Sequence, residues 1–69
     1  MSAPAPSLDL HRRVRAAFVL QGTSMKAWCI KNQIHPSNVR NALIGSWNGP
    51  AGQAMRQRVI QASGLKEMA

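Results

Sequence analysis

The side chains best suited to recognise another molecule are concentrated on one short segment, residues 36–44. Arg40 can donate to both acceptors on the major-groove edge of guanine, and Asn41 can form a pair of hydrogen bonds with adenine. Ser37 can bond a base near the beginning of the segment, and Ile44 can contact the methyl group of thymine. These four residues are therefore candidates for direct contact with DNA bases.

Other kinds of chemistry have few candidates in this sequence. Asp9 and Glu67 are the only carboxylate side chains and lie near opposite ends, so a carboxylate pair for acid–base catalysis is not expected. Cys29 is the single cysteine, and together with two histidines it does not match the spacing of zinc ligands. We expect no enzymatic activity, no cofactor, no metal and no small-molecule ligand.

The charge of the chain indicates a polyanionic partner. Nine Lys and Arg residues against two acidic residues give a net charge of +7 on 69 residues. Such an excess favours binding to DNA, RNA or an acidic membrane surface. The sequence has neither an apolar run of the roughly 18 residues that span a membrane nor a secretory signal, so we expect an intracellular chain without a membrane partner.

The elements that must position these residues are helices. Apolar residues recur at helical spacing and no segment alternates with a period of two, which predicts an all-α protein. Glycine and proline divide the chain into four helices, expected at about 8–21, 25–32, 36–44 and 50–64. The residues expected to cap the first three helices are Ser7, Ser24 and His35. One domain over residues 7–64 is predicted, with a disordered arm over residues 1–6 and a short tail over residues 65–69.

The inward face of each helix is predicted from apolar residues three and four positions apart. In the first and third helices these are Leu10, Val14, Ala17, Phe18, Val39, Ala42 and Leu43. In the fourth helix they are Ala51, Met55, Val59 and Ala62. Val19 and Ile60 fall outside these faces and are candidates for a surface of self-association.

Residues 24–44 have the pattern of a helix-turn-helix. Two short helices flank a tight turn at Gln33 and Ile34, and the small residue Cys29 allows their backbones to approach. Ile34 and Val39 would fill the angle between the two helices. The second helix, residues 36–44, would be about 13 Å long at a rise of ~1.5 Å per residue, which suits a major groove ~12 Å wide.

The segment SMKAWCIKNQIHPSNVRNALIGSW resembles the helix-turn-helix of the small lambda-repressor-like DNA-binding proteins, and most of all the Ner-type regulators of transposable phages and prophages. The resemblance is carried by Ser24, by Pro36-Ser37-Asn38, and by Asn41-Ala42-Leu43 followed by Trp47, and it covers about half of the chain. It implies a compact four-helix lambda-repressor-like domain, a bacterial cytoplasmic or nucleoid location, and transcriptional repression of a phage or prophage operon. Gln33 stands where the family favours a left-handed glycine.

The residues around this segment are candidates for contacts with DNA phosphates. They are Arg12, Arg13, Arg15, Ser24, Lys26, Lys31, His35 and Asn38. Because one such domain reads few base pairs, we expect a homodimer, at least on operator DNA.

Two other functions use the same helices. The protein could be an architectural or recombination accessory protein that bends DNA, or a protein–protein adaptor that does not bind DNA. Binding to RNA is less favoured because the chain has no Tyr, one Phe and two Trp to stack on bases. The leading hypothesis is a sequence-specific double-stranded DNA-binding regulator that represses by occupying a promoter.

Overall fold

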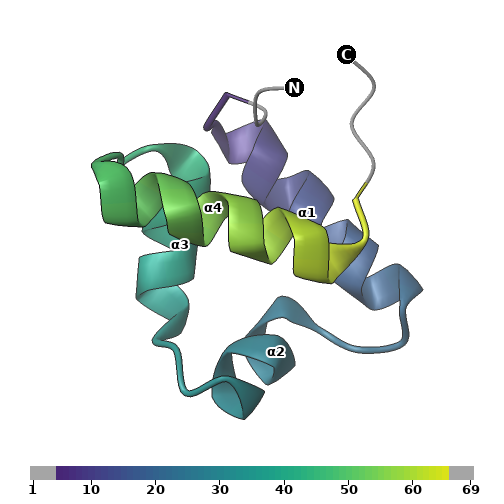
Figure 1. Ribbon diagram of the computed structural model, residues 1–69. Coiled ribbons are helices and arrows are strands. Elements are labelled where there is room, and N and C mark those ends of the chain that lie inside the picture. Colours follow the sequence, from purple (N-terminus) through teal and green to yellow (C-terminus); the bar gives the residue numbers. More distant parts are fainter. Residues whose placement is uncertain (1–4, 66–69) are drawn as a thin grey trace.

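Each helix of the chain begins at a capping residue or at a proline. A computed structural model describes residues 5–65, which form α1 (Leu8–Leu20), α2 (Met25–Lys31), α3 (Pro36–Ile44) and α4 (Pro50–Ser63), as Figure 1 shows. The described residues contain no strand. The predicted all-α class with four helices is confirmed, and each helix boundary lies within one residue of its predicted position.

The three predicted caps are all formed. The side-chain oxygen of Ser7 accepts a hydrogen bond from the amide of Leu10 at 2.9 Å, and that of Ser24 accepts from the amide of Ala27 at 3.0 Å. His35 caps α3 through Nδ1, which accepts from the amide of Ser37 at 3.2 Å. These bonds satisfy backbone donors that a helix N-terminus otherwise leaves unpaired.

The turn between α2 and α3 keeps a left-handed residue although that residue is not glycine. Gln33 has φ +58°. Its amide donates to the carbonyl of Ile30 at 3.1 Å, and the amide of Ile34 donates to the carbonyl of Cys29 at 2.9 Å. This pair of bonds is a Schellman motif, which ends α2 sharply and directs the chain into α3.

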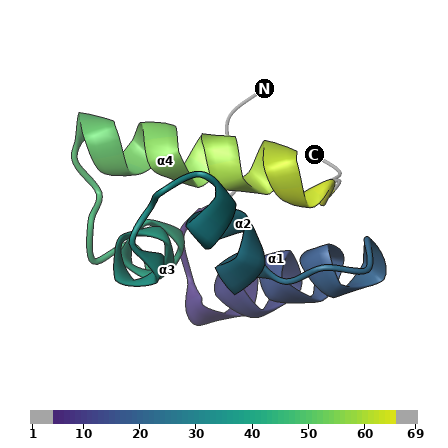
Figure 2. The same ribbon diagram turned by 90° about the horizontal axis from the view of Figure 1, so that it is seen from below.

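The four helices form two layers that α3 connects. Figure 2 shows α1 and α4 as two layers, with α3 at one side and α2 in front of the space between the layers, and α3 contacts each of the other three helices. The buried hydrophobic cluster draws on every helix and comprises Leu10, Val14, Phe18, Cys29, Val39, Leu43, Val59 and Ile60. The inward faces predicted for α1 and α3 are confirmed, since all seven residues are buried.

The inward face predicted for α4 is correct at Val59, which is buried, and at Met55 and Ala62, which pack against the core, but it is wrong at Ala51 and Ile60. Ala51 is exposed, whereas Ile60, which was expected to point outward, is only 9% exposed and belongs to the core. The buried residues of α4 are Gly52, Arg56, Val59, Ile60 and Ser63. A Cβ atom on Gly52 would overlap the carbonyl oxygen of Trp47, so glycine is what lets α4 pack with this face inward. Three of these buried positions are not apolar, which is why the hydrophobic period did not reveal them.

Both ends of the described chain are tied to the helices. The amide of Ser7 donates to the carbonyl of Leu43 at 2.9 Å, and Pro6 lies directly over Gly45. Leu65 packs against the core beyond the end of α4. Of the arm and tail expected at the two ends, residues 1–4 and 66–69 lie outside the described residues. Within residues 5–65, none of the helices has the length and apolar character needed to cross a membrane.

Candidate nucleic-acid interface

Both cations of α4 contact residues outside this helix. The guanidinium of Arg56, which is 6% exposed, donates to the carbonyl of Ala42 at 3.0 Å and to Oδ1 of Asn48 at 2.9 Å. The guanidinium carbon of Arg58 lies 5.5 Å from the centroid of the Trp28 ring, and Nη2 donates to Oδ1 of Asn32 at 3.3 Å. Arg56 is thus buried, whereas Arg58 makes its contacts from an exposed position.

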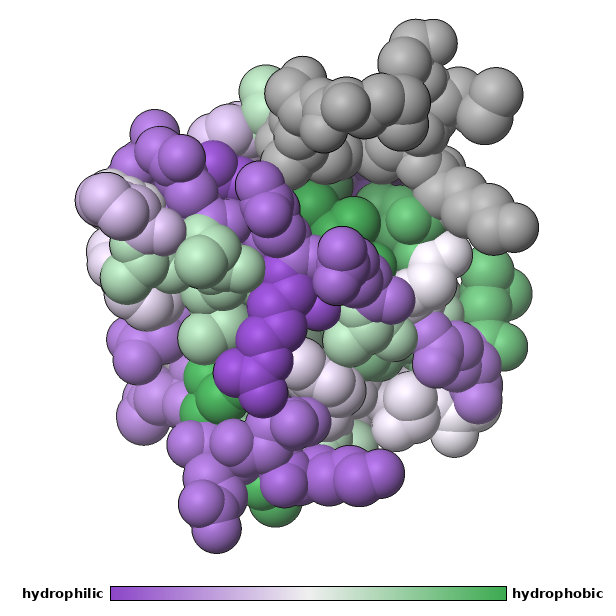
Figure 3. Space-filling view, viewed as in Figure 1, coloured by the Kyte–Doolittle hydropathy of each residue, from purple (hydrophilic) through white to green (hydrophobic). Residues whose placement is uncertain are grey.

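The outer side of α4 is polar but uncharged. Gln53, Gln57 and Gln61 follow one another at intervals of four residues, and all three are exposed. Figure 3 shows hydrophilic and apolar patches side by side on the face that carries α4. The three glutamines add hydrogen-bonding groups without charge, and Arg58 is the exposed cation of this helix.

Arg13 lies apart from the other arginines of α1. It forms an ion pair with Asp9 at 3.9 Å, one turn earlier on the same helix. Since successive helical residues are about 100° apart, Arg13 points to the opposite side of α1 from Arg15. The structure does not bring Arg13 together with the other predicted phosphate contacts.

The remaining described cations are exposed and lie on the first three helices. They are Arg12, Arg15, Lys26, Lys31 and Arg40. None of these five forms an ion pair with Asp9, the single carboxylate side chain among residues 5–65. Among residues 5–65, six of the seven exposed cations thus lie on the first three helices, and the seventh is Arg58 of α4.

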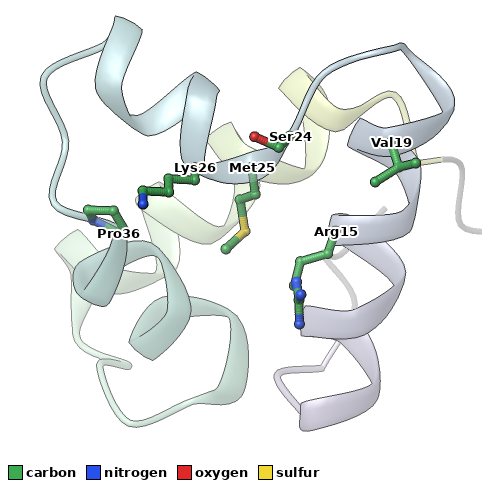
Figure 4. Close-up of a pocket in the computed structure, with 6 residues that line it drawn as sticks. All are labelled: Arg15, Val19, Ser24, Met25, Lys26 and Pro36. Atoms are coloured by element: carbon green, nitrogen blue, oxygen red, sulfur yellow. The ribbon is translucent and has the colours of Figure 1, made fainter.

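Arg15 and Lys26 border a shared groove. This groove has a volume of about 280 Å³ and lies between α1, the beginning of α2 and the beginning of α3. In Figure 4, Arg15 projects from α1 on one side, Met25 points into the space between the helices, and Lys26 extends toward Pro36. The floor is apolar and the two rims are cationic, which is an arrangement suited to the sugar–phosphate backbone of a nucleic acid.

Arg40 of α3 lies near the arginines of α1. Partial burial of His11, and then the charges of Arg15, Arg40 and Arg12, lower the pKa of the His11 imidazole. The three arginines thus come from two helices that pack against each other. Together with Lys26 they form what we call the basic surface: Arg12, Arg15, Lys26 and Arg40.

The side chains predicted to read bases differ in exposure. Ser37, Asn38 and Arg40 are exposed, whereas Asn41 and Ile44 are half-buried. The carbonyl of Asn41 also accepts hydrogen bonds from the amides of Gly45 and Trp47, both at 3.0 Å, which fixes the backbone at the end of α3. The first half of α3 is consequently the more accessible part.

The other predicted contact residues have varied surroundings. Ser24 lines the groove, and its Oγ is already engaged as the cap of α2. His35 is exposed, with Nδ1 engaged as the cap of α3. Lys31 is exposed in the last turn of α2 but does not line the groove.

Cys29 and Trp28, whose side chains could take part in chemistry, instead pack within the fold. Cys29 is 0% exposed, and burial raises the pKa of its thiol. Trp28 packs between Arg58 and Phe18, with 6.0 Å between the ring centroids of the two aromatic side chains. Residues 5–65 contain no cluster of three or more His, Cys, Asp or Glu side chains that could hold a metal ion.

Two residues that shape this region, His11 and Arg56, were not predicted from the sequence. His11 precedes Arg15 by four positions, so the helical period alone could have placed both on one side of α1. The burial of Arg56 could not be predicted from the helical period, because it depends on the acceptors that Ala42 and Asn48 supply.

Comparison of the chain with family models, with curated proteins and with solved structures finds no match. Its function is therefore inferred from its own geometry and charge.

Proposed function

We propose that the protein is a sequence-specific double-stranded DNA-binding protein of the lambda-repressor-like type, in which α2 and α3 act as a helix-turn-helix and α3 enters the major groove. The observation that carries this proposal is the distribution of positive charge. Among residues 5–65, six of the seven exposed cations lie on α1, α2 or α3, and the seventh, Arg58 of α4, contacts Trp28 and Asn32.

In this proposal, different residues hold the DNA backbone and read the bases. Arg12, Arg15 and Lys26 hold phosphates and set the position of the domain, while Ser37 and Arg40 on the accessible half of α3 read base edges. The nine residues of α3 form a rod about 13 Å long, which fits a groove ~12 Å wide. Asn41 and Ile44 add contacts from the half-buried end of the helix.

The role we propose for this binding is repression of a phage or prophage operon by occupation of its promoter. Support for it comes from the resemblance of residues 24–47 to the Ner-type regulators. The left-handed turn at Gln33 and the buried small residue Cys29 are consistent with that resemblance. DNA bending without repression would instead indicate an architectural or recombination accessory protein.

Operator binding is proposed to involve a homodimer. A single nine-residue helix contacts few base pairs, and two-fold dimers on symmetric half-sites are the usual means of lengthening the site. Ile60 cannot contribute to the dimer surface because it belongs to the core. Val19, the other residue predicted for this surface, is 66% exposed, and Leu8, Leu20 and Ile30 are further exposed large apolar side chains.

Selection of bound fragments from random duplex DNA, followed by footprinting, tests the proposal. We expect enrichment of one site with two symmetric halves. Neutralisation of about four phosphates predicts a log–log salt slope near −3.6. Failure to enrich any duplex sequence would contradict the proposal and favour a protein–protein adaptor. Enrichment of single-stranded RNA from a parallel pool would contradict it in favour of an RNA-binding protein.

A further inference from the structure

His11 lies within the arginine cluster of the basic surface. It is half-buried on α1, one turn before Arg15 and next to Arg12, and α3 packs against this helix. Arg40 of α3 acts on the imidazole as well as the two arginines of α1. His11 thus lies beside Arg12 and Arg15 on α1, the helix that packs against the helix carrying Arg40.

No negative charge on the described residues compensates this cluster. Asp9 is two residues from His11, so it projects from the opposite side of α1, where it pairs with Arg13. From α2, Lys26 adds a further positive charge across the groove beside Arg15. From α4, Arg56 and Arg58 are engaged with α3 and α2. The group best suited to this position is an external anion.

We infer that His11 is a phosphate-binding residue of the basic surface and that it takes up a proton when duplex DNA binds. This inference rests on the proposed function and adds His11 to the predicted contact residues. In the free domain the neutral imidazole avoids repulsion from the arginines. A bound phosphate reverses the local charge, so that a protonated imidazole can donate a charge-assisted hydrogen bond to a phosphate oxygen.

If His11 takes up a proton on binding, DNA affinity and the stability of the fold respond to pH in opposite directions. The pKa of His11 in the free domain lies below the ordinary value of 6.5. The unfolded chain therefore binds this proton more readily, and the domain loses stability as the pH falls from above 6.5 toward the lowered pKa. Bound phosphate raises the pKa, so DNA affinity increases as the pH falls through the interval between the bound and free values.

The test measures affinity for a selected duplex by fluorescence anisotropy at constant salt, from about pH 8 to about pH 5.5, the range in which histidine titrates. We expect affinity to rise on acidification by up to about tenfold for each unit by which DNA raises the pKa of His11. Phosphodiesters remain ionised throughout this range, so the proton belongs to the protein. Calorimetry in two buffers of different ionisation enthalpy measures its uptake directly.

Three variants assign the proton to its residue. His11→Gln keeps a neutral donor, and we expect it to bind at pH 8 but to lose most of the pH dependence. His11→Arg fixes the charge and should bind without the response to pH. His35→Asn, which retains an acceptor for the cap of α3, removes the other predicted histidine contact, and a pH response lost in this variant but kept in His11→Gln would overturn the inference. Circular dichroism confirms that each variant is folded.

The outcomes separate this inference from the proposed function. Duplex binding by the wild-type protein without proton uptake, or with the same pH dependence in His11→Gln, would overturn the role of His11 and leave DNA binding intact. Absence of duplex binding at every pH by the folded wild-type protein would overturn both.

Discussion

The guanidinium of Arg56 donates from Nη1 to the backbone carbonyl of Ala42 at 3.0 Å, so a buried side chain of α4 holds the C-terminal part of α3. The same nitrogen donates to Oδ1 of Asn48 in the connection that follows α3. A positive charge at this end of α3 also complements the helix dipole. The helix proposed to enter DNA is therefore fixed at one end from inside the molecule.

Replacement of Arg56 by methionine tests this connection. The apolar side chain has a similar length, but it leaves the carbonyl of Ala42 and the amide oxygen of Asn48 without their donor. An unpaired buried group costs about 1–3 kcal/mol, so we expect a loss of about 2 kcal/mol in the free energy of unfolding by urea. A value within about 0.5 kcal/mol of wild type, the usual range for surface substitutions, would show that Arg56 does not stabilise the fold.

Gly52 tests the close approach of α4 to the Trp47 backbone. In Gly52→Ala the added Cβ would overlap the Trp47 carbonyl, and we expect a loss of about 3 kcal/mol, the scale of overpacking in a core. Gly49→Ala is the matched control, since a Cβ at Gly49 meets no atom within 4 Å. Thermal unfolding of both variants should separate them clearly, and equal destabilisation would argue against the packing described for α4.

Gln33 tests the cost of a left-handed residue in the turn. Gln33→Gly removes the contact between Cβ and carbonyl that disfavours φ +58°, and we expect about 1 kcal/mol of added stability. Gln57→Gly, on the exposed side of α4, should instead destabilise by about 1 kcal/mol because glycine is a poor helix former. Urea titrations of the two variants should therefore shift in opposite directions. A shift of Gln33→Gly to lower stability would contradict the turn geometry.

Cys29 provides a probe of opening of the core. Its thiol is 0% exposed and burial raises its pKa, so both access and thiolate formation are suppressed in the native state. We expect a thiol reagent to label native protein at least about 10³-fold more slowly than protein unfolded in urea, as expected for a domain of ordinary stability. Ala16→Cys in a Cys29→Ala background, at an exposed position of α1, is the control. Similar rates for Cys29 in native and unfolded protein would contradict its burial.

The first three helices were predictable because their signals are local. Ser7, Ser24 and the His35-Pro36 pair mark helix beginnings through bonds made within three residues. The buried faces of α1 and α3 also follow from a regular apolar period.

The burial of Gly52 and Arg56 on α4 could not be predicted in the same way, because it depends on contacts with residues outside this helix. Gly52 is buried against the backbone of Trp47, and Arg56 is buried because Ala42 and Asn48 supply acceptors. Counting apolar residues therefore placed Ala51 inward and Ile60 outward, and both assignments were wrong.

The candidate site could likewise be predicted only in part from the sequence. The charges on α1 and α2 could be named from the sequence, whereas the position of His11 among Arg12, Arg15 and Arg40 required the packing of α1 on α3.

The division between phosphate contacts and base reading is tested most directly by Arg40→Ala and Lys26→Ala. Affinity is measured for the selected duplex and for a scrambled duplex of the same composition, at several salt concentrations. Lys26→Ala should weaken both complexes equally and reduce the magnitude of the salt slope by about 0.9.

For Arg40→Ala we expect a loss of about 1–3 kcal/mol on the selected duplex and a clearly smaller loss on the scrambled one. That result would place Arg40, and with it α3, against base edges. Equal losses on the two duplexes would contradict insertion of α3 into the major groove.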